Sequence, residues 1–370
     1  MDYDLYPSCR DLLGNPWVSD LHITVGDPVR VRESGSLVFT DAAIVDDQGI
    51  RQLLKQLRHD LADPESVIQR AETRRDGGEA RTGHDFSASI GTHRCRCNLS
   101  RANGGSLSLV LRRLSENVPD LDSLGLPFSV IQQIDRPTGL ILVTGPTGSG
   151  KSTTLASMLD YLNRTASKHI LTIEDPVEYV IRPAKCKVTR KEVGTDAASF
   201  LSALRAAVRQ DPDIIMVGEI RDLETMRAAL SAAETGHLVF ATLHTNSAPK
   251  TIDRVGSFFP ESEKNWAYAV LASVINCIVS QTLVPRMDGE GRALAREILI
   301  GTSAIKANIK EAKLNLITND IEQGGSSGHQ SLSRHLSDLV SQKIISRDAA
   351  MGQAYDPARL GEYLSRVGLN

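Results

Sequence analysis

The sequence predicts two domains, a small α+β domain followed by a larger α/β domain built on a parallel sheet. Its length of 370 residues is enough for about two ordinary domains, each with its own core. The first part contains short strands in which apolar and polar residues alternate, and the second contains continuous apolar runs separated by helical stretches. A glycine-rich loop joins the first of those apolar runs to a helix, which is the order that a phosphate-binding site needs.

Composition and charge limit the possible classes of function. The chain has 42 Lys and Arg residues against 45 Asp and Glu residues, a formal charge of −3. The overall charge therefore gives no case for nucleic acid, although a local basic patch stays open, and we expect no direct nucleic-acid partner. The five cysteines are scattered, form no C-x-x-C pair and suit a reducing compartment. We find neither a signal peptide nor an apolar run of roughly 18 residues, and we therefore expect a cytoplasmic protein.

The first domain is predicted over residues 1–114 and begins with strands. Leu21, Ile23 and Val25 alternate with polar residues, as in a half-buried strand. A stretch rich in Asp, Ser and Pro, residues 115–126, is the predicted linker to the second domain. The other predicted elements are two strands within 28–39 joined by a glycine turn, helices at 46–59 and 64–74, and strands at 85–90, 93–102 and 106–114.

The second domain is predicted over residues 127–350, with a C-terminal tail at 351–370. Its apolar runs alternate with helical stretches, which is the pattern of a parallel sheet covered by helices on both faces. A helix at 151–165 directly follows the glycine-rich loop. The apolar runs are 139–144, 169–173, 213–217 and 237–243.

The loop has the pattern G-x-x-x-x-G-K-S, which is typical of a phosphate cradle. Its glycines let backbone N–H groups converge on the phosphates, and the helix that follows adds the positive end of its dipole. Lys151 reaches the β- and γ-phosphates of a nucleotide, and the Ser152 hydroxyl is a ligand for Mg²⁺. The predicted nucleotide-binding residues are Gly145, Pro146, Thr147, Gly148, Ser149, Gly150, Lys151, Ser152 and Thr153.

Acidic residues and a histidine follow the other apolar runs. Glu174 comes directly after the second run, and Glu219 follows the third run after Gly218. Both lie where parallel strands end, which is where ligands bind in such sheets, and carboxylates there can hold the Mg²⁺ shell and orient a water. His237 and His244 bracket the fourth run. His244 follows that strand and is the better placed of the two to sense a γ-phosphate.

Four stretches together resemble one known family, the PilT-like branch of the type II/IV secretion ATPases. "GPTGSGKST", "TIEDPVEY", "VGEIRD" and "TGHLVFATLHT" are similar in order and spacing to its Walker A, Asp, Walker B and His boxes. Outside the boxes, "SDLHITVGDPVRVR" resembles the opening of the family's PAS-like N-terminal domain, and "AREILIGTSAIKANIKEAK" (295–313) its late helical region. The likeness covers roughly residues 19–350 and implies a RecA-like P-loop NTPase domain behind the PAS-like one.

The resemblance also implies an activity, partners and roles for residues. It implies a homohexameric, Mg²⁺-dependent ATPase that binds the platform protein of a pilus or secretion machine on the cytoplasmic face of the inner membrane. Lys151 and Ser152 would bind phosphate and Mg²⁺, with Glu174 of the Asp box holding Mg²⁺ partly through water. Glu219 would position the attacking water, and His244 would contact the γ-phosphate.

Arginines of the first domain complete the set that the resemblance implies. Arg94, Arg96 and Arg112 match family arginines that reach the nucleotide across a domain or subunit boundary. An arginine supplied in this way stabilises transition-state charge and ties hydrolysis to domain position. Arg113 is an alternative to Arg112.

Several functions remain open at this stage. The absence of paired C-x-x-C motifs disfavours the branch that carries a tetracysteine zinc module, namely the pilus-extension and type II secretion ATPases. The region after Leu314 fits both pilus-retraction motors and the related ATPases of type IVB secretion and plasmid conjugation. A RecA-like hexameric helicase is a rival, although aromatic residues for base stacking make up only 4% of the chain. A nucleotide-gated subunit that does not hydrolyse ATP is another.

Overall fold

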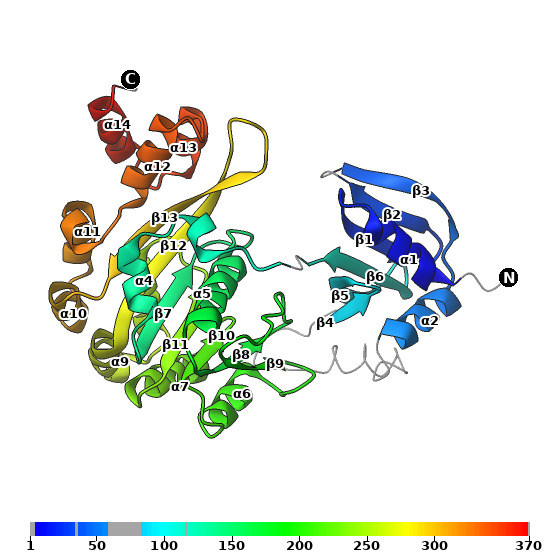
Figure 1. Ribbon diagram of the computed structural model, residues 1–370, viewed down its shortest axis with the longest axis horizontal. Helices are drawn as coiled ribbons and strands as arrows, with labels where there is room; N and C mark the ends of the chain where they lie inside the picture. The colour runs from blue at the N-terminus through cyan, green and yellow to red at the C-terminus, as the bar shows by residue number, and fades with distance from the viewer. Residues whose placement is uncertain (1–3, 34–35, 58–82, 115–116, 369–370) are drawn as a thin grey trace. The chain divides into compact units, whose positions relative to one another are not determined.

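The structure, a computed structural model, describes residues 4–33, 36–57, 83–114 and 117–368. The chain divides into two units (Figure 1). The first contains Met1–Asn117 and the segment Asp175–Val180, and the second contains Val118–Glu174 and Ile181–Asn370. Each unit has a hydrophobic core of its own. The domain boundaries predicted after residues 114, 126 and 350 stay predictions.

An antiparallel sheet forms the first unit, with the strand order β3-β2-β1-β6-β5-β4 in the described residues. Side chains alternate between the two faces of a strand, so one set can be buried while the other stays polar. Leu21 and Ile23 of β1 are fully buried, as their alternation predicts. The strands are β1 (Val18–Thr24), β2 (Pro28–Glu33), β3 (Ser36–Ile44), β4 (Gly83–Ile90), β5 (His93–Ala102) and β6 (Ser106–Arg113).

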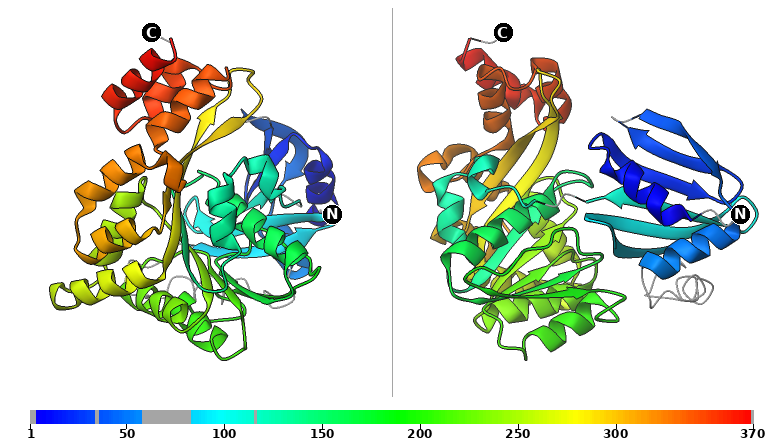
Figure 2. Two further views of the ribbon diagram at one scale, coloured as in Figure 1. Left: turned by 60° about the vertical axis from the view of Figure 1, so that its left-hand side comes forward. Right: turned by 45° about the vertical axis from the view of Figure 1, so that its right-hand side comes forward.

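Helices α1 (Leu5–Gly14) and α2 (Asp47–Leu57) cover one face of this sheet (Figure 2). The helix predicted at 46–59 is confirmed as α2, and its apolar side is buried. Helix α1 is not among the predicted elements, because its buried side consists of only three residues, Leu5, Cys9 and Leu13. The predicted glycine turn within 28–39 and the predicted helix at 64–74 lie outside the described residues.

A mostly parallel sheet forms the second unit, with the strand order β13-β12-β7-β11-β10-β8-β9 in the described residues. All neighbouring pairs from β12 to β9 are parallel, and only β13 runs antiparallel to its neighbour. The four apolar runs are confirmed as strands β7, β8, β10 and β11. The strands are β7 (Gly139–Thr144), β8 (His169–Glu174), β9 (Lys187–Glu192), β10 (Ile214–Val217), β11 (Leu238–Leu243), β12 (Ile275–Pro285) and β13 (Arg292–Ile300).

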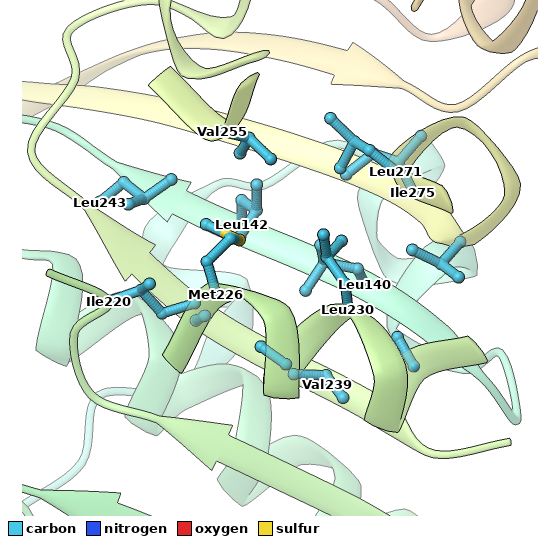
Figure 3. Close-up of a cluster of buried hydrophobic side chains, with 14 of the residues drawn as sticks. Leu140, Leu142, Ile220, Met226, Leu230, Val239, Leu243, Val255, Leu271 and Ile275 are labelled. Carbon is cyan, nitrogen blue, oxygen red and sulfur yellow. The ribbon is translucent and has the colours of Figure 1, made fainter. Parts of the chain in front are cut away.

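Helices cover both faces of the second sheet, so its central strands contribute to two cores. In β7, Leu140 and Leu142 enter one core, whereas Ile141 and Val143 enter the other. Figure 3 shows the first of these cores, in which Leu142 lies beside Met226 and Leu140 beside Leu230 of the neighbouring helix. Burial on both faces is the reason that the run is continuously apolar.

Two groups of helices cover the second sheet. Helices α4 (Phe128–Ile134) and α5 (Lys151–Thr165) lie on one face. On the other face are α6 (Phe200–Ala207), α7 (Leu223–Glu234), α8 (Ala248–Ser257), α9 (Glu261–Val274), α10 (Ser303–Lys310) and α11 (Leu314–Gln323). Short 3₁₀ helices occupy Leu121–Leu124 and Gly325–Ser327.

The late part of the chain differs from the sequence-based expectation. The segment 295–313 was expected to be helical, but its residues up to Ile300 form strand β13. Backbone pairing with β12, from Cys277↔Ile300 to Pro285↔Arg292, holds these residues extended and buries their apolar side chains.

After α11 come the helices α12 (Leu332–Ser341), α13 (Arg347–Gln353) and α14 (Pro357–Arg366). They form a small core with residues of the hairpin of β12 and β13. Within the stretch 351–370, which was predicted to be a tail, Leu360 and Leu364 of α14 are fully buried.

The predicted α/β fold class is confirmed, and the PAS-like character of the first unit stays a prediction. Among the helices that the structure describes, none is both long and apolar enough to cross a lipid bilayer.

Candidate active site

The carboxyl ends of four neighbouring parallel strands, β7, β11, β10 and β8, carry the predicted site of the second unit. The glycine-rich loop leaves β7, His244 follows β11, Glu219 follows β10 and Glu174 ends β8. Thr144 and Leu243 are partners in the sheet register, so the loop and His244 leave at the same level. Open parallel sheets bind ligands at this edge.

Glycine is required at the start of the loop. Gly145 has a φ of 148°, a region that residues with a side chain rarely adopt. A Cβ atom added to Gly145 would lie 2.2 Å from the carbonyl oxygen of Gln281, a backbone atom of β12. The close approach of the two backbones therefore depends on the missing side chain.

Lys151 folds back over the loop. Its Nζ donates hydrogen bonds to the carbonyl oxygens of Gly145, at 2.9 Å, and Pro146, at 3.0 Å. Helix α5 begins at Lys151, and its N-cap, Gly150, supplies no capping side chain. The first N–H groups of a helix have no partner within the helix, so this end suits an anion. The loop therefore fits a phosphate group.

Glu219 lies between two potential cations. His244 Nε2 is 2.8 Å from its Oε1, and Arg221 Nη2 donates to its Oε2 at 2.6 Å. Burial acts to raise the pKa of the Glu219 carboxyl, but Arg221 and then His244 outweigh it, so the pKa lies below its usual value. Glu219 is therefore a charged acceptor at neutral pH. The structure thus brings two of the predicted residues, Glu219 and His244, into direct contact.

Glu174 is buried at the end of β8. The Thr172 hydroxyl donates to its Oε1 at 2.8 Å. Because Ile173 and Val217 are register partners, Glu174 lies level with Gly218, directly before Glu219. His237, the weaker of the two histidine candidates, instead contacts the Ala232 carbonyl near the end of α7, at 2.9 Å.

The predicted arginines lie in the first unit, on one side of its sheet. Arg96 of β5 and Arg112 of β6 are direct register partners, and Arg94 lies two residues before Arg96. Arg94 donates to the Ser87 hydroxyl at 2.9 Å, and Arg96 lies 3.9 Å from Asp85. Within the same unit, Arg94 also contacts the carbonyl of Val177 at 3.4 Å, and Arg96 lies 3.9 Å from Glu178.

Arg112 and Arg113 differ in what they contact. Arg112 Nε donates to Asp20 Oδ1 at 2.7 Å, and the Arg112 side chain is 67% exposed while that of Asp20 is only 5% exposed. Arg113 instead donates to the carbonyls of Leu13, in the last turn of α1, and Asn15, directly after α1, each at 3.1 Å. Arg113 therefore holds the end of a helix, and Arg112 is the one that reaches solvent.

A cavity of about 590 Å³ opens beside the first turn of α5, within the second unit. The first turn contributes Gly150 and Thr153, and strand β12 contributes Gln281. Gln281 is buried, and its amide donates to the Ser149 carbonyl at 2.7 Å. The cavity therefore continues from the glycine loop towards the hairpin of β12 and β13.

Comparison with known proteins identifies the family. The model of the family described as type II/IV secretion system protein matches residues 45–360. The chain belongs to this family. It is 44% identical over 340 residues to the type IV pilus retraction ATPase PilT of Pseudomonas aeruginosa, covering 92% of this chain and 95% of that protein.

Two solved structures agree with this family. A crystal structure of the pilus retraction motor PilT with bound ADP has a TM-score of 0.85 and 40% identity, covering 97% of this chain and 99% of the other. The ATPase DotB of Legionella pneumophila has a TM-score of 0.79 and 27% identity, covering 94% and 93%. The predicted PilT-like resemblance, the ATPase class and the assignment to pilus or secretion motors are confirmed at the level of this family.

The sequence did not predict the roles of two residues at the site, Arg221 and Gln281. Arg221 lies inside a quoted box, but its pairing with Glu219 becomes visible only in the structure. Gln281 supports the glycine loop from a strand that follows more than a hundred residues later. The only available signal was a polar residue inside an apolar run, in "INCIVSQTLVP". The functions of the individual site residues stay predictions.

Proposed function

We propose that this family member is an ATP-driven motor of the pilus-retraction type, in which hydrolysis at the carboxyl ends of β7, β11 and β10 moves the two units of the chain. The observation that carries the proposal is the 2.8 Å contact of His244 with Glu219. His244 follows β11, which adjoins the strand leading into the glycine loop, and Glu219 follows β10, the next strand in the sheet. This contact connects a carboxylate that can orient water with a side chain that can report the γ-phosphate.

Residues Gly145–Thr153 would hold the phosphates of ATP. Lys151 already donates to loop carbonyls, and a phosphate would offer it a more strongly charged acceptor. The cavity beside Gly150 and Thr153 would receive the ribose and base, because it continues from the loop within the same unit. These contacts orient the γ-phosphate towards the ends of β10 and β11.

Ser152 and Glu174 would hold Mg²⁺, Glu174 partly through water. Hydroxyl and carboxylate oxygens are the ligands that Mg²⁺ prefers, and Glu174 follows a strand at the same edge of the sheet as the loop. A bound Mg²⁺ supplies a positive charge that polarises phosphate oxygens. The chain itself would supply the Ser152 hydroxyl and the Glu174 carboxylate and hold both in place.

Glu219 would accept a hydrogen bond from the attacking water and orient it in line with the γ-phosphate. Its lowered pKa keeps it charged at neutral pH, as an acceptor needs to be. His244 would contact the γ-phosphate and pass its presence or loss to Glu219. Arg221 holds the second oxygen of Glu219 and so restricts its orientation.

Arg94, Arg96 and Arg112 would bring positive charge to the transition state from another part of the assembly. The exposure of Arg112 supports this role, because a group that acts across a boundary must reach solvent in the isolated chain. Such sharing of a site requires an oligomer, and we propose a homohexamer. Hydrolysis would then depend on the relative position of the units.

In the cell we place this motor in the cytoplasm, bound to an inner-membrane platform protein of a pilus machine. The 40% identity to the PilT structure, against 27% to the DotB structure, favours pilus retraction over type IVB secretion. Complementation separates the two: expression in a Pseudomonas aeruginosa strain without PilT should restore retraction, whereas expression in a Legionella pneumophila strain without DotB should not restore secretion. The opposite pattern would reverse the assignment.

The catalytic assignment is tested with Glu219→Gln. ATP binding should persist, since the loop is untouched, while hydrolysis falls by about a hundredfold or more because the water loses its orienting carboxylate. Binding is measured with a fluorescent ATP analogue and turnover by phosphate release. Glu224→Gln is the matched control: Glu224 lies in the next helix and contacts Arg205 at 3.6 Å. Equal turnover in the two variants would remove Glu219 from the mechanism.

A further inference from the structure

The segment from His244 to Ser247 connects β11 to α8, and its position decides where the His244 ring lies. Ser247 is the N-cap of α8, and its hydroxyl accepts from the N–H of Lys250 at 3.4 Å. Ser247 and Ala248 are both buried. The ring of a histidine that precedes such a buried anchor stays in place only if other elements fix the anchor.

Glu297 of β13 provides the first fixed point. Its side chain is 4% exposed, and its Oε1 accepts a hydrogen bond from the backbone N–H of Ala248 at 2.7 Å. Ala248 is the first residue of α8, where helical N–H groups lack partners within the helix. A carboxylate at this end is also favoured by the helix dipole. Glu297 therefore holds the start of α8 from a separate strand.

Thr251 of α8 provides the second fixed point. Its side chain is fully buried. Its hydroxyl donates to the Ser247 carbonyl at 2.7 Å and lies 2.6 Å from the Thr245 hydroxyl. One hydroxyl can donate once and accept twice, so both contacts can form together. Thr251 thus holds two of the four residues in the segment.

Thr251 also contacts β7, the strand that leads into the glycine loop. The Thr251 hydroxyl lies 3.4 Å from the hydroxyl of Thr144, which directly precedes Gly145. Thr144 in turn lies 2.8 Å from the Ser280 hydroxyl. Ser280 is the register partner of both Thr144 and Glu297, so these three residues form one polar row across β7, β12 and β13.

All three residues of the polar row are buried. Burial of a polar group costs free energy unless a hydrogen bond compensates it, and apolar residues would fill a core at lower cost. The contacts of the row reach Ala248 and Thr251 of α8 rather than a surface. The row therefore holds the start of α8, which the segment His244–Ser247 precedes.

We propose that Glu297 and Thr251 are positioning residues for hydrolysis, holding the segment His244–Ser247 so that the His244 ring stays beside Glu219 and level with the glycine loop. The inference rests on the proposed function, in which His244 and Glu219 act at the γ-phosphate. Neither Glu297 nor Thr251 touches the reacting atoms. They act through the backbone of the segment.

Paired variants test the proposal in the full-length protein. Glu297→Leu and Thr251→Val remove the hydrogen-bonding groups, whereas Glu297→Gln and Thr251→Ser keep an acceptor or a hydroxyl in the same place. Thr189→Val is the matched control, because the Thr189 hydroxyl lies 2.9 Å from His169 at the amino-terminal end of β8. Two readouts are needed: hydrogen–deuterium exchange of the peptide covering 244–248, and kcat and KM for ATP.

We expect faster exchange in Thr251→Val and Glu297→Leu, together with a fall in kcat of about tenfold or more and a KM within about threefold, because misplacement of a catalytic group acts on the chemical step. The conservative variants and Thr189→Val should resemble the unchanged protein. Unchanged exchange overturns the inference whatever the turnover. Faster exchange with normal kcat also overturns it, since the contacts would then be only structural. Failure of the proposed function is seen separately, as normal turnover in Glu219→Gln.

Discussion

Glu297→Gln should make the second unit more stable at neutral pH while removing part of its pH dependence. Burial raises the pKa of the Glu297 carboxyl from 4.5 to about 7; the hydrogen bond from Ala248 lowers it, and the charge of Glu322 adds to the rise. The folded state therefore binds more protons than the unfolded state between these two pH values. The stability that the protonated Glu297 carboxyl contributes is fully present below pH 4.5 and is lost as the pH rises to about 7.

The magnitude follows from the pKa difference. A shift of one pKa unit corresponds to about 1.4 kcal/mol, so the rise from 4.5 to about 7 removes about 3 kcal/mol of stability above pH 7. Between pH 5 and pH 8 the loss is about 2 to 3 kcal/mol, since part of the titration lies below pH 5. Glutamine does not titrate and keeps a carbonyl oxygen that can accept from Ala248. The variant should therefore gain this amount at pH 8 and little at pH 5.

The assay is urea unfolding at several pH values, at one protein concentration and without nucleotide. The chain has two tryptophans, Trp17 in the first unit and Trp266 in the second, so a Trp17→Phe background leaves a fluorescence signal from the second unit alone. The quantity of interest is the difference between Glu297→Gln and the unchanged residue at each pH, because the titration of all other groups cancels. Glu224→Gln controls for net charge.

A difference that stays constant from pH 5 to pH 8 would refute the reasoning, because it would mean that the Glu297 carboxyl titrates in the folded protein as it does in the unfolded chain. A difference that decreases with pH would show that α8 stabilises the carboxylate more than burial disfavours it.

Three further predictions concern the loop and the arginines. Lys151→Ala should lose most ATP affinity and turnover, because no other side chain places a positive charge inside the loop; near-normal turnover of the purified variant would contradict the site. Arg113→Ala should destabilise the first unit by about 2 kcal/mol, because it removes the hydrogen bonds to the carbonyls of Leu13 and Asn15, each worth about 1 kcal/mol; the loss is measured by urea unfolding with Trp17 as the probe in a Trp266→Phe background. Mixed assemblies of Lys151→Ala and Arg112→Ala subunits should regain part of the ATPase activity if Arg112 acts across the subunit boundary; a mixture that stays inactive would limit Arg112 to its own chain.

The sequence predicts best the elements that a local pattern identifies by itself. The apolar runs at β7, β8, β10 and β11 are buried on both faces, so neither alternation nor partners are needed to recognise them. The glycine loop is equally direct, since its pattern combines the glycines, the lysine and the helix start in one local stretch. Local signals of this kind place the phosphate cradle without any knowledge of the fold.

Elements whose stability comes from distant partners are predicted poorly. Strand β13 lies in a stretch expected to be helical, and its extended backbone depends on pairing with β12. Helix α1 is short, and its few apolar residues gain stability only against the first sheet. In both cases tertiary contacts decide the local structure, which propensity within one window cannot capture.

The residues that hold the site in place share a feature that is visible in the sequence. A polar residue inside an apolar run that is buried on both faces must find a hydrogen bond, because an unpaired polar group there is costly. Thr172 of β8 donates to Glu174, and Thr242 of β11 donates to the Gly218 carbonyl directly before Glu219. At the end of β7, the hydroxyls of Thr144 and Ser280 form a hydrogen bond with each other. Thr172 and Thr242 each lie two residues before a residue to which we assign a role in hydrolysis, Glu174 and His244. Thr144 directly precedes the glycine loop, and Ser280 is its register partner. The hydroxyls of these residues therefore fix the backbone and side chains that the chemistry uses. The sequence alone does not identify the hydrogen-bond partner, because the partner can lie on another strand. It does identify the buried threonines and serines themselves, and their replacement by valine or alanine should lower turnover more than stability.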